Sequence, residues 1–471
     1  MKTIEVRLEY KQENFLNDVQ DIPRAFSPYL IVREDAEHFL GWDYSYDNTC
    51  LSVTFFSDIF AKKVKKEEYV FTDLYSFRKE VKHYLKCELY RFLSEELQIK
   101  LSYGSLTGVR PTKLYYELLE NSQFPEEILV EKYDVSQEKT NLIANCVKNQ
   151  KKYKNADEKS IGFFVNIPFC PTRCKYCSFI STEVFRVKKE LPFYVECVKK
   201  EIEESFRIME KNGYSVSSVY VGGGTPTSIG ATFLNEIISP LKNLGVEFTV
   251  EAGRPDAIDK DIIATLKKNN VTRVSVNPQT FHNETLDRIG RKHTIEDFMT
   301  AYDLMTKAGF SVNVDLIAGL PGESYDDFLF SIDSAIGLKP DNLTVHTLSL
   351  KRGSSFTVEG MEKREYGLVG EMVSYAHSAL DRAGYVPYYM YRQKNMADNL
   401  ENTGYTLPGK QCVYNIDMME ESASIIGVGA GSMSKLIVGD RIERFSDPKG
   451  FREYCERIID TIERKKTFFT L

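Results

Sequence analysis

The sequence predicts an α/β protein whose central part is built around a parallel sheet. Three observations predict it. Strand-like segments alternate with helical patterns between about residues 161 and 347, several of these strands are polar on one face, and a cysteine-rich and a glycine-rich loop directly follow the first two strands. Repeated βα units form parallel sheets. Both an open sheet and a closed or partial barrel fit this pattern.

The whole chain has the composition of a globular protein. Its 471 residues are 42% apolar and 27% charged, which suggests two or three domains. The net charge of -7 leaves no basic footprint for nucleic acid. The start, MKTIEVRLEYKQ, alternates apolar and charged residues and contains no signal core. We therefore predict a cytoplasmic protein with no membrane span and no nucleic-acid partner.

Changes in composition along the chain predict three domains. Residues 1–155 are expected to form an α+β domain with strands at 51–56 and 68–71 and an amphipathic helix near 75–97. The almost wholly polar segment 148–160 marks its end as a linker. Residues 156–385 hold the parallel sheet, and residues 386–471 are expected to form a smaller α+β domain over its mouth.

Six parallel strands are predicted, at 161–167, 217–221, 247–251, 272–277, 311–317 and 342–347. Parallel strands covered on both faces are usually apolar throughout. These strands are not, because in 272–277 Val274 and Val276 share one face while polar residues share the other. The alternation therefore predicts helices outside and a polar, lined cavity inside.

Polar residues lie near the carboxyl ends of these strands, where α/β barrels place their active sites. They are Asn166, Glu251, Asn277, Asp315 and His346. Any one of them could be a capping or turn residue. Because five lie on one rim, directly beside the cysteine loop, the sequence predicts a functional site there.

The loop after the first strand carries Cys170, Cys174 and Cys177 in the spacing CxxxCxxC. Three thiolates can bind three irons of a 4Fe-4S cube and leave the fourth for an exogenous ligand, and S-adenosylmethionine fits. A structural zinc site and merely packed, reduced thiols are the alternatives. Zinc usually takes four ligands arranged in CxxC pairs, and the sequence has no second pair. Cys197 lies off the apolar stripe of its predicted helix, away from the sheet.

The loop after the second strand contains three consecutive glycines, Gly222 to Gly224, followed by Thr225. Neither GxxxxGK[ST] nor GxGxxG is present, which disfavours a nucleotide phosphate loop. A tight turn is the simplest explanation. One βα unit after the cysteine loop, however, its backbone could hold the amino and carboxylate groups of a bound amino acid.

Further motifs complete a known pattern. They are Ile167-Pro168-Phe169-Cys170, Glu251, Gln279 with Arg291, Asp315 to Pro321, Thr107 to Lys113 and Leu407 to Lys410. Between about Ile161 and Gly431 the chain resembles radical S-adenosylmethionine enzymes of the oxygen-independent coproporphyrinogen III oxidase group. The amino-terminal extension and the motif at 407–410 most resemble its coproporphyrinogen dehydrogenase branch, HemZ.

The resemblance implies a partial (β/α)6-type barrel and assigns roles to individual residues. Cys170, Cys174 and Cys177 would bind the cluster, Tyr176 the adenine, and Gly223, Gly224 and Thr225 the methionine end of S-adenosylmethionine. Glu251, Gln279, Arg291 and Asp315 would orient the rest of that molecule. Phe164 stands where the family has a tyrosine, so a hydroxyl contact is lost.

The resemblance also implies a reaction. One electron, from a donor such as flavodoxin or ferredoxin, splits S-adenosylmethionine into methionine and a 5'-deoxyadenosyl radical, which takes hydrogen from a propionate of coproporphyrinogen III. Loss of carbon dioxide and one electron leaves a vinyl group. Such a tetrapyrrole needs cations and an apolar wall. Possible cations are Arg254, Arg273, Lys351 and Arg352, and a possible wall or lid is Tyr388, Tyr389, Tyr391 and Arg392.

One position departs from the decarboxylase pattern. Ser178 is followed by Phe179, where the decarboxylase has a fourth cysteine and the related haem chaperones have phenylalanine. A haem chaperone of the same superfamily is therefore the first alternative. A radical methyltransferase or ring-opening enzyme acting on haem is the second, and a module with a structural metal is the third.

Overall fold

The structure is a computed structural model that describes residues 3–10, 15–27, 29–47, 49–69, 73–154, 157–179, 181–349, 367–393, 396–439 and 441–470. Lys351 and Arg352 lie outside the described residues. The chain divides into two compact units, Met1–Ala144 with Arg392–Leu400, and Asn145–Tyr391 with Glu401–Leu471. The predicted division into three domains at 155 and 385 stays a prediction.

The first unit packs helices on a five-stranded sheet. The strand order is β2 (Leu30–Val32), β1 (Ile4–Tyr10), β3 (His38–Tyr46), β4 (Cys50–Ser57) and β5 (Lys63–Glu68). The helices are α1 (Leu16–Val19), α2 (Asp21–Ala25), α3 (Leu74–Leu97), α4 (Pro111–Asn121), α5 (Pro125–Glu131) and α6 (Gln137–Gln150), of which α6 continues into the second unit.

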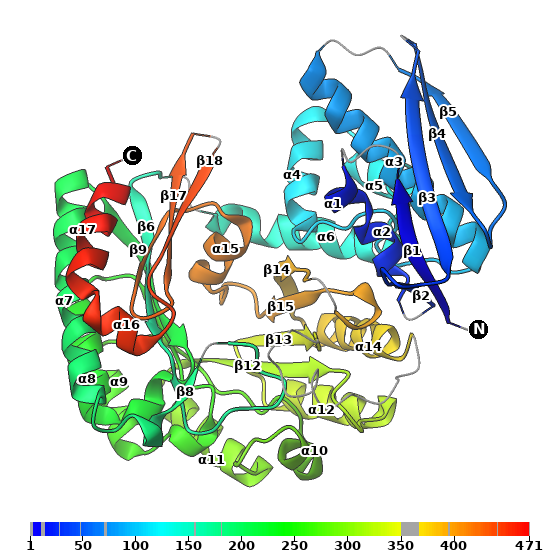
Figure 1. Cartoon of the computed structure of the whole chain (residues 1–471). Coiled ribbons are helices and arrows are strands. Elements are labelled where there is room, and N and C mark those ends of the chain that lie inside the picture. The colour runs from blue at the N-terminus through cyan, green and yellow to red at the C-terminus, as the bar shows by residue number, and fades with distance from the viewer. Residues whose placement is uncertain are drawn as a thin grey trace. The chain divides into compact units, whose positions relative to one another are not determined.

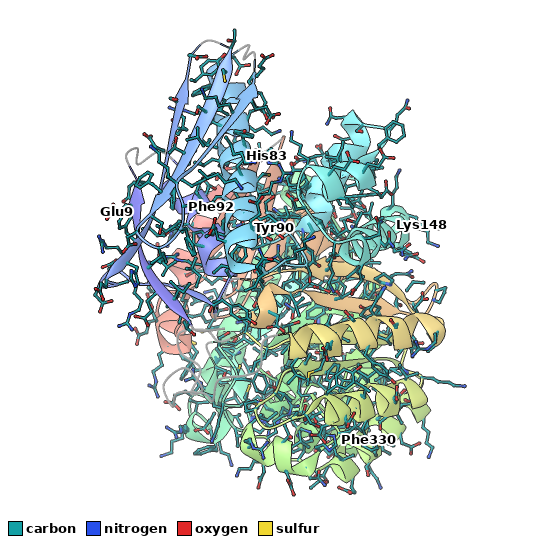
Figure 2. All side chains as sticks on the ribbon, turned by 90° about the vertical axis from the view of Figure 1, so that its right-hand side faces the viewer. Glu9, His83, Tyr90, Phe92, Lys148 and Phe330 are labelled. Atoms are coloured by element: carbon teal, nitrogen blue, oxygen red, sulfur yellow. The ribbon has the colours of Figure 1, made fainter. Side chains whose placement is uncertain are left out.

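The long helix α3 covers this sheet with its aromatic side chains. Its Phe92, labelled in Figure 2, stacks on Phe55 of β4 with ring centroids 5.3 Å apart. The predicted strand at 51–56 and helix at 75–97 are confirmed by β4 and α3. Of the predicted strand at 68–71, Glu68 is the last residue of β5, and residues 70 and 71 lie outside the described residues. The polar linker begins inside α6, whose last turn extends to Gln150.

The second unit contains the predicted parallel sheet. The neighbouring parallel strands are, in order, β13 (Asn342–Thr347), β12 (Ser311–Ala318), β11 (Arg273–Ser275), β10 (Glu247–Glu251), β9 (Ser215–Gly223) and β6 (Ser160–Ile167). All six predicted strands are confirmed, although β11 is shorter than expected. This is the six-stranded core of a partial (β/α)6 barrel.

Helices cover the outer face of this sheet (Figure 1). They are α7 (Leu191–Asn212), α8 (Ala231–Ile238), α9 (Lys260–Lys268), α10 (Asn283–Arg288), α11 (Ile295–Lys307), α12 (Tyr325–Gly337) and α14 (Leu368–Arg382). Capping boxes begin α11 at Thr294 and α12 at Ser324. The apolar strand residues, such as Val274 and Val314, are fully buried against this layer. The polar residues that alternate with them therefore face the inside.

Residues 386–471 extend the same sheet on both sides. Beyond β13 lie the antiparallel strands β15 (Asn402–Thr406) and β14 (Val386–Tyr391), and beyond β6 lie β16 (Ile425–Val428), β17 (Met433–Val438) and β18 (Arg441–Ser446). Helices α15 (Val413–Glu420), α16 (Phe451–Glu456) and α17 (Ile458–Phe468) complete the segment.

The remaining described elements are short and connect the longer ones. They are the strands β7 (Phe169–Cys170) and β8 (Thr182–Glu183) and the 3-10 turns η1 (Lys151–Tyr153), η2 (Val184–Arg186), η3 (Pro226–Ile229), η4 (Ser239–Leu241), η5 (Pro255–Ala257) and η6 (Ala397–Asn399).

A buried cluster of charged groups joins α17 to α7. Lys465 pairs with Glu201 and, at 3.2 Å, with Asp447, and all three side chains are almost fully buried. Burial and the charge of Glu201 raise the pKa of Asp447 to about 7.

Cys197 lies off the sheet-facing side of α7, as predicted, but it is only 4% exposed because α16 covers it. No described helix is long and apolar enough to span a membrane.

Candidate functional site

The cysteine loop lies directly at the carboxyl end of β6. Phe169–Cys170 forms a short ladder with β8, and the Lys175 backbone N–H donates to the Ile289 carbonyl at 2.9 Å. Inside the loop the Cys177 N–H donates to the Cys174 carbonyl at 3.1 Å. These backbone bonds hold the loop in place, and all three thiols on it are only partly buried. The loop therefore presents Cys170, Cys174 and Cys177 together at the rim.

Each of the three sulfur atoms has a hydrogen-bond donor. Thr225 Oγ1 lies 3.6 Å from Cys170 Sγ, Arg254 Nη1 lies 3.7 Å from Cys174 Sγ, and the Phe179 backbone N–H donates to Cys177. Hydrogen bonds to cluster sulfurs help to set the reduction potential of an iron-sulfur cluster. This arrangement suits three thiolates that carry negative charge.

Metal binding would displace protons from these thiols. Burial raises the pKa of Cys170 above its usual value and the pKa of Cys177 to about 11. Only the thiolates bind metal, so loading a cluster releases protons. Among the described residues, no three His, Cys, Asp or Glu side chains are arranged to hold one ion. Thiolates that bind three separate irons of a cube need not converge on one point.

Arg254 supports the cysteine loop from the end of β10. Arg254 is 3% exposed, and its guanidinium binds Asp256 through Nε and Nη2 at 2.8 and 2.7 Å. The remaining Nη1 donates to Thr172 Oγ1 at 3.0 Å as well as pointing at Cys174. Arg254, which the sequence suggested as a possible cation for the tetrapyrrole, therefore holds the cysteine loop in place.

The glycine loop packs against the backbone of the cysteine strand. Gly223 has φ +111°, and a Cβ there would lie 2.1 Å from Asn166 Oδ1. A Cβ at Gly224 would lie 2.5 Å from the Phe169 carbonyl oxygen. The Gly224 and Thr225 N–H groups donate to the carbonyls of Ile167 and Phe169 at 2.8 and 2.7 Å. Side chains at these glycines would separate the two loops.

Glu251 ends β10 directly beside the glycine loop. Its Oε1 accepts a hydrogen bond from the Tyr220 hydroxyl at 2.6 Å, and its carboxylate also accepts the Gly223 N–H. Burial raises the pKa of Glu251 to about 7, against the opposing effect of the Tyr220 hydrogen bond, and Asp315 raises it further. The carboxylate is therefore poised between its charged and neutral forms near neutral pH.

The other rim residues converge on Asp315. Asn277 Nδ2 donates to Asp315 Oδ2 at 2.8 Å, and His346 Nε2 lies 3.7 Å from the same oxygen. Gln279 has φ +72°, and its backbone N–H donates to the Asp315 carbonyl. The buried side-chain oxygens of Asn277 and Gln279 have no partner among the described residues. The structure thus brings four of the five predicted rim residues, Glu251, Asn277, Asp315 and His346, into one cluster. The fifth, Asn166, lies beside the glycine loop.

Arg291 is buried beneath the cysteine loop. Nη1 donates to the Tyr176 hydroxyl at 2.9 Å, and Nη2 donates to the carbonyls of Gly253 and Asn277 at 2.6 and 2.7 Å. Arg291 Nε and both ring nitrogens of His293 have no partner among the described residues. Burial, together with the charges of Arg291 and Arg254, lowers the pKa of His293 to about 2. The roles of Arg291 and Tyr176 as cofactor contacts stay predictions.

Aromatic side chains fill the interior between these strands. Phe164 stacks on Tyr414 at 6.0 Å, and Tyr389 lies so close to Gly404 that a Cβ there would be 1.9 Å from its ring. Tyr388 and Tyr389 are buried in the same cluster, and Tyr391 packs against it. Arg392 belongs to the first unit, where it donates to the Leu106 carbonyl. These tyrosines line the inside of the sheet as core residues.

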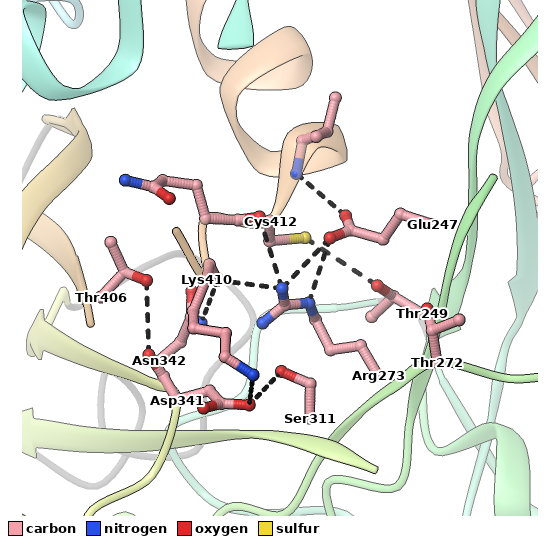
Figure 3. Close-up of polar contacts among 12 residues, drawn as sticks. Glu247, Thr249, Thr272, Arg273, Ser311, Asp341, Asn342, Thr406, Lys410 and Cys412 are labelled. Carbon is pink, nitrogen blue, oxygen red and sulfur yellow. Dashed lines mark hydrogen bonds and ion pairs between the residues drawn. The ribbon is translucent and has the colours of Figure 1, made fainter. Parts of the chain in front are cut away.

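The proposal of Arg273 as a substrate cation is wrong. Arg273 is the first residue of β11, at the end of the sheet opposite the cysteine loop. Its guanidinium binds Glu247 at 3.1 Å and the Lys410 carbonyl at 2.9 Å (Figure 3), and it also binds Asn313 at 2.9 Å. The segment that precedes α15 therefore closes this end of the strands. The placement of 386–471 over the mouth stays a prediction.

Comparison with known proteins identifies the family. The model of the radical SAM superfamily matches residues 165–335. Over 410 residues the chain is 38% identical to the oxygen-independent coproporphyrinogen-III oxidase-like protein HemZ of Bacillus subtilis, covering 82% of this chain and 81% of that protein. The chain belongs to the HemZ family of radical SAM proteins. Its cofactors are a 4Fe-4S cluster and S-adenosylmethionine, as the cysteine spacing predicted.

Two further relatives place this HemZ-family chain in a wider group. The haem chaperone HemW of Escherichia coli is 26% identical over 325 residues, covering 66% of this chain and 81% of that protein. The solved coproporphyrinogen III oxidase HemN of Escherichia coli superposes with a TM-score of 0.54 at 20% identity, covering 66% of this chain and 72% of that chain. The structural match confirms the radical SAM fold.

The sequence motifs did not single out Tyr220 and did not predict that Arg254 holds the cysteine loop, while the role of Arg254 as a tetrapyrrole partner stays a prediction. Tyr220 lies two residues before Gly222, so strand alternation places it on the same inward face as the glycine. The two-residue period of the strand was therefore the signal that could have identified Tyr220. No local pattern could have paired Arg254 with Cys174, because the two residues belong to loops 80 positions apart that meet only in the folded sheet.

Proposed function

We propose that this protein carries out the oxidative decarboxylation of coproporphyrinogen III propionates to vinyl groups, giving protoporphyrinogen IX in anaerobic haem biosynthesis. The observation that carries the proposal is the 38% identity to the coproporphyrinogen-III oxidase-like HemZ over most of both chains. The rim supports it, because Arg291 bonds both to Tyr176 of the cysteine loop and to the Asn277 carbonyl, which links the three thiols to the buried amides of Asn277 and Gln279. The unpartnered side-chain oxygens of these amides could accept hydrogen bonds from a bound ligand.

The chain's own residues have distinct tasks in this proposal. Together, a reduced cluster and S-adenosylmethionine supply the one-electron cleavage that yields an organic radical. Cys170, Cys174 and Cys177 would bind the cluster, and the donors on their sulfur atoms would set its charge balance. Tyr176 would contact the adenine. Gly223, Gly224 and Thr225 would hold the methionine end, since these residues lie directly against the cysteine strand.

The charged rim residues would orient the rest of the cofactor. Glu251 and Asp315 offer carboxylates to the amino group and the ribose hydroxyls. Gln279 Oε1 and Arg291 Nε are buried polar atoms that lack a partner among the described residues. Because buried polar atoms normally form hydrogen bonds, a bound ligand is expected to supply the missing partners. A cytoplasmic one-electron carrier such as flavodoxin or ferredoxin would reduce the cluster, and the tetrapyrrole would be the substrate.

An anaerobic turnover experiment tests this function. The cluster is reconstituted and reduced, S-adenosylmethionine and coproporphyrinogen III are added, and 5'-deoxyadenosine and the tetrapyrrole are followed together by mass. We expect a vinyl product to form along with the nucleoside. Nucleoside with an unaltered tetrapyrrole would contradict the decarboxylase proposal, and a gain in tetrapyrrole mass would indicate methyl transfer instead.

Two cysteine variants serve as matched controls. Cys174→Ala should lose cluster iron and form no nucleoside, because one of the three ligands is gone. Cys197→Ala removes a buried thiol on α7 instead and should keep both. If Cys174→Ala held a full complement of iron and still cleaved the cofactor, the cluster assignment would be wrong.

A haem chaperone is the second candidate, and Phe179 favours it. This side chain follows the cysteine triplet by two residues and is 67% exposed. The chain is also 26% identical to the haem chaperone HemW. Spectroscopic titration with haem separates the two functions. Tight stoichiometric haem binding without any vinyl product would favour the chaperone.

A further inference from the structure

Tyr220 and Glu251 form a hydrogen-bonded pair directly beneath the first glycine of the loop. The Tyr220 hydroxyl lies 2.6 Å from Glu251 Oε1. A Cβ added to Gly222 would lie 2.9 Å from the Tyr220 ring and 3.0 Å from the Glu251 carboxyl carbon. Glycine at 222 therefore leaves room for both side chains to meet at the end of β9. The pair lies at the predicted cofactor rim, but sequence motifs assign a role only to Glu251.

We propose that Tyr220 is a positioning residue of the cofactor site, whose hydroxyl holds the Glu251 carboxylate in one orientation and keeps it ionised toward the amino group or ribose hydroxyls of S-adenosylmethionine. This inference rests on the proposed role of Glu251 as a cofactor contact. It adds a residue that acts through Glu251 and does not itself have to touch the ligand.

The surroundings of Glu251 explain why such a residue is needed. Burial and the nearby Asp315 disfavour its charged form, while the Gly223 N–H, the Tyr220 hydroxyl and the charge of His346 favour it. Tyr414, on α15, faces the same carboxylate. A neutral Glu251 could not form an ion pair with an ammonium group. The hydrogen bond from Tyr220 therefore favours the form that binds a cation.

Tyr414 provides a matched control for Tyr220. The two rings stack with centroids 4.4 Å apart and an interplanar angle of 20°. The Tyr414 hydroxyl is buried and has no hydrogen-bond partner among the described residues. Tyr220→Phe and Tyr414→Phe each remove one hydroxyl and keep the ring stack. Only the first removes a hydrogen bond to Glu251.

The test is equilibrium binding of S-adenosylmethionine to the full, cluster-loaded chain without oxygen, between about pH 6 and 8.5, a range that brackets the pKa of Glu251. We expect Tyr220→Phe to raise Kd about tenfold near pH 7, because a hydrogen bond to a charged group is lost. The pH below which affinity declines should also rise by about one unit, since Glu251 would protonate more easily. Tyr414→Phe should stay within about twofold of the wild type at every pH.

Two further variants keep the inference open to refutation. In a Glu251→Gln background, Tyr220→Phe should change affinity by less than about twofold, because its effect passes through the carboxylate. Gly222→Ala adds a Cβ that separates Tyr220 from Glu251, so it should weaken S-adenosylmethionine binding as Tyr220→Phe does. It replaces Tyr220→Phe in the test if Tyr220→Phe loses its cluster. Equal affinity and equal pH profiles for Tyr220→Phe and Tyr414→Phe would overturn the inference. A wild-type protein that binds no S-adenosylmethionine would instead overturn the proposed function.

Discussion

The two ends of the parallel strands differ in how their buried polar groups are paired. At the amino end the Arg273 guanidinium bonds to Glu247 and the Lys410 carbonyl (Figure 3), and it also bonds to Asn313 and the Gln411 carbonyl. The buried atoms without a described partner there include only oxygens of neutral side chains, such as those of Ser218, Asn342 and Gln411. A buried charge that is fully paired is a structural feature, since removing either partner would leave the other uncompensated.

At the carboxyl end several charged or polar groups are only partly paired. Arg291 Nε, both nitrogens of His293 and the side-chain oxygens of Asn277 and Gln279 have no partner among the described residues. Buried polar atoms without partners cost free energy, so a protein retains them where a ligand can pair with them. The pairing at the amino end therefore serves stability, whereas the unpartnered atoms at the carboxyl end agree with the proposal that a ligand binds there.

The largest expected effect is on stability, at the amino end. Arg273→Met should lower the free energy of unfolding by about 3–5 kcal/mol, because Glu247 would be left buried without its cation. Urea unfolding of the apoprotein measures this. The affinity of the cluster-loaded variant for S-adenosylmethionine should change by less than about twofold, since Arg273 lies far from the rim.

Arg457→Met is the matched control for Arg273. Arg457 forms exposed pairs with Glu453 and Asp460 on the helical surface. Its removal should cost less than about 0.5 kcal/mol. An equal loss for the two variants would show that the Arg273 pairing is not what stabilises the amino end.

The second effect is steric and lies at the carboxyl end. Gly224→Ala would place a Cβ 2.5 Å from the Phe169 carbonyl oxygen, a backbone atom that cannot easily move. We expect a loss of about 2 kcal/mol and weaker retention of cluster iron, because the glycine loop would push on Cys170. Thermal unfolding and iron analysis measure both.

Gly213→Ala separates this crowding from the general cost of replacing glycine. Gly213 ends α7 with φ +67°, and its added Cβ would meet no atom within 4 Å. That variant should lose about 1 kcal/mol through backbone strain alone and keep its iron. Loss of iron in both variants would mean that crowding at Gly224 is not the cause.

The third effect depends on pH. The pKa of Glu251 is about 7 in the fold and about 4.5 when unfolded, so the folded protein binds more protons between these values. This group's contribution to stability therefore falls as pH rises from about 5 to 8. Relative to the wild type, Glu251→Gln should gain about 1–3 kcal/mol over that range, measured by urea unfolding. The exposed Glu443→Gln should show no such trend.

The smallest effect concerns Phe179. Its side chain is 67% exposed, so Phe179→Ala should change stability by less than about 0.5 kcal/mol and keep the cluster. Phe179→Pro removes the backbone N–H that donates to Cys177 and should make the cluster potential more negative. Redox titration followed by electron paramagnetic resonance compares the two, and identical potentials would mean that this hydrogen bond is unimportant.

Much of the fold was predictable because strand alternation is a local property. A partial barrel covers one face of each strand with helices and leaves the other polar, so the period of two in 272–277 and 311–317 marked both faces. The error at Arg273 came from ignoring its position along the strand. Arg273 begins β11, and side chains at the amino end do not reach the rim.

Cys197 shows the limit of a helical pattern. Its position off the apolar stripe of α7 was correctly predicted, yet it is buried because α16, which lies far later in the chain, packs on that second face. Periodicity reports which residues share a face of one element. It does not report which other element covers that face.

The sequence by itself determined the three closely spaced thiols, the glycine loop after the next strand and the alternation of strands and helices that predicts a parallel sheet, because each depends on residues that are neighbours along the chain. Only the tertiary structure decided that Tyr220 holds Glu251, that Arg254 supports Cys174 and that Arg291 bonds to Tyr176. These contacts join segments 31, 80 and 115 residues apart. Their partners are chosen by the register of neighbouring strands and the packing of loops, which no local pattern encodes.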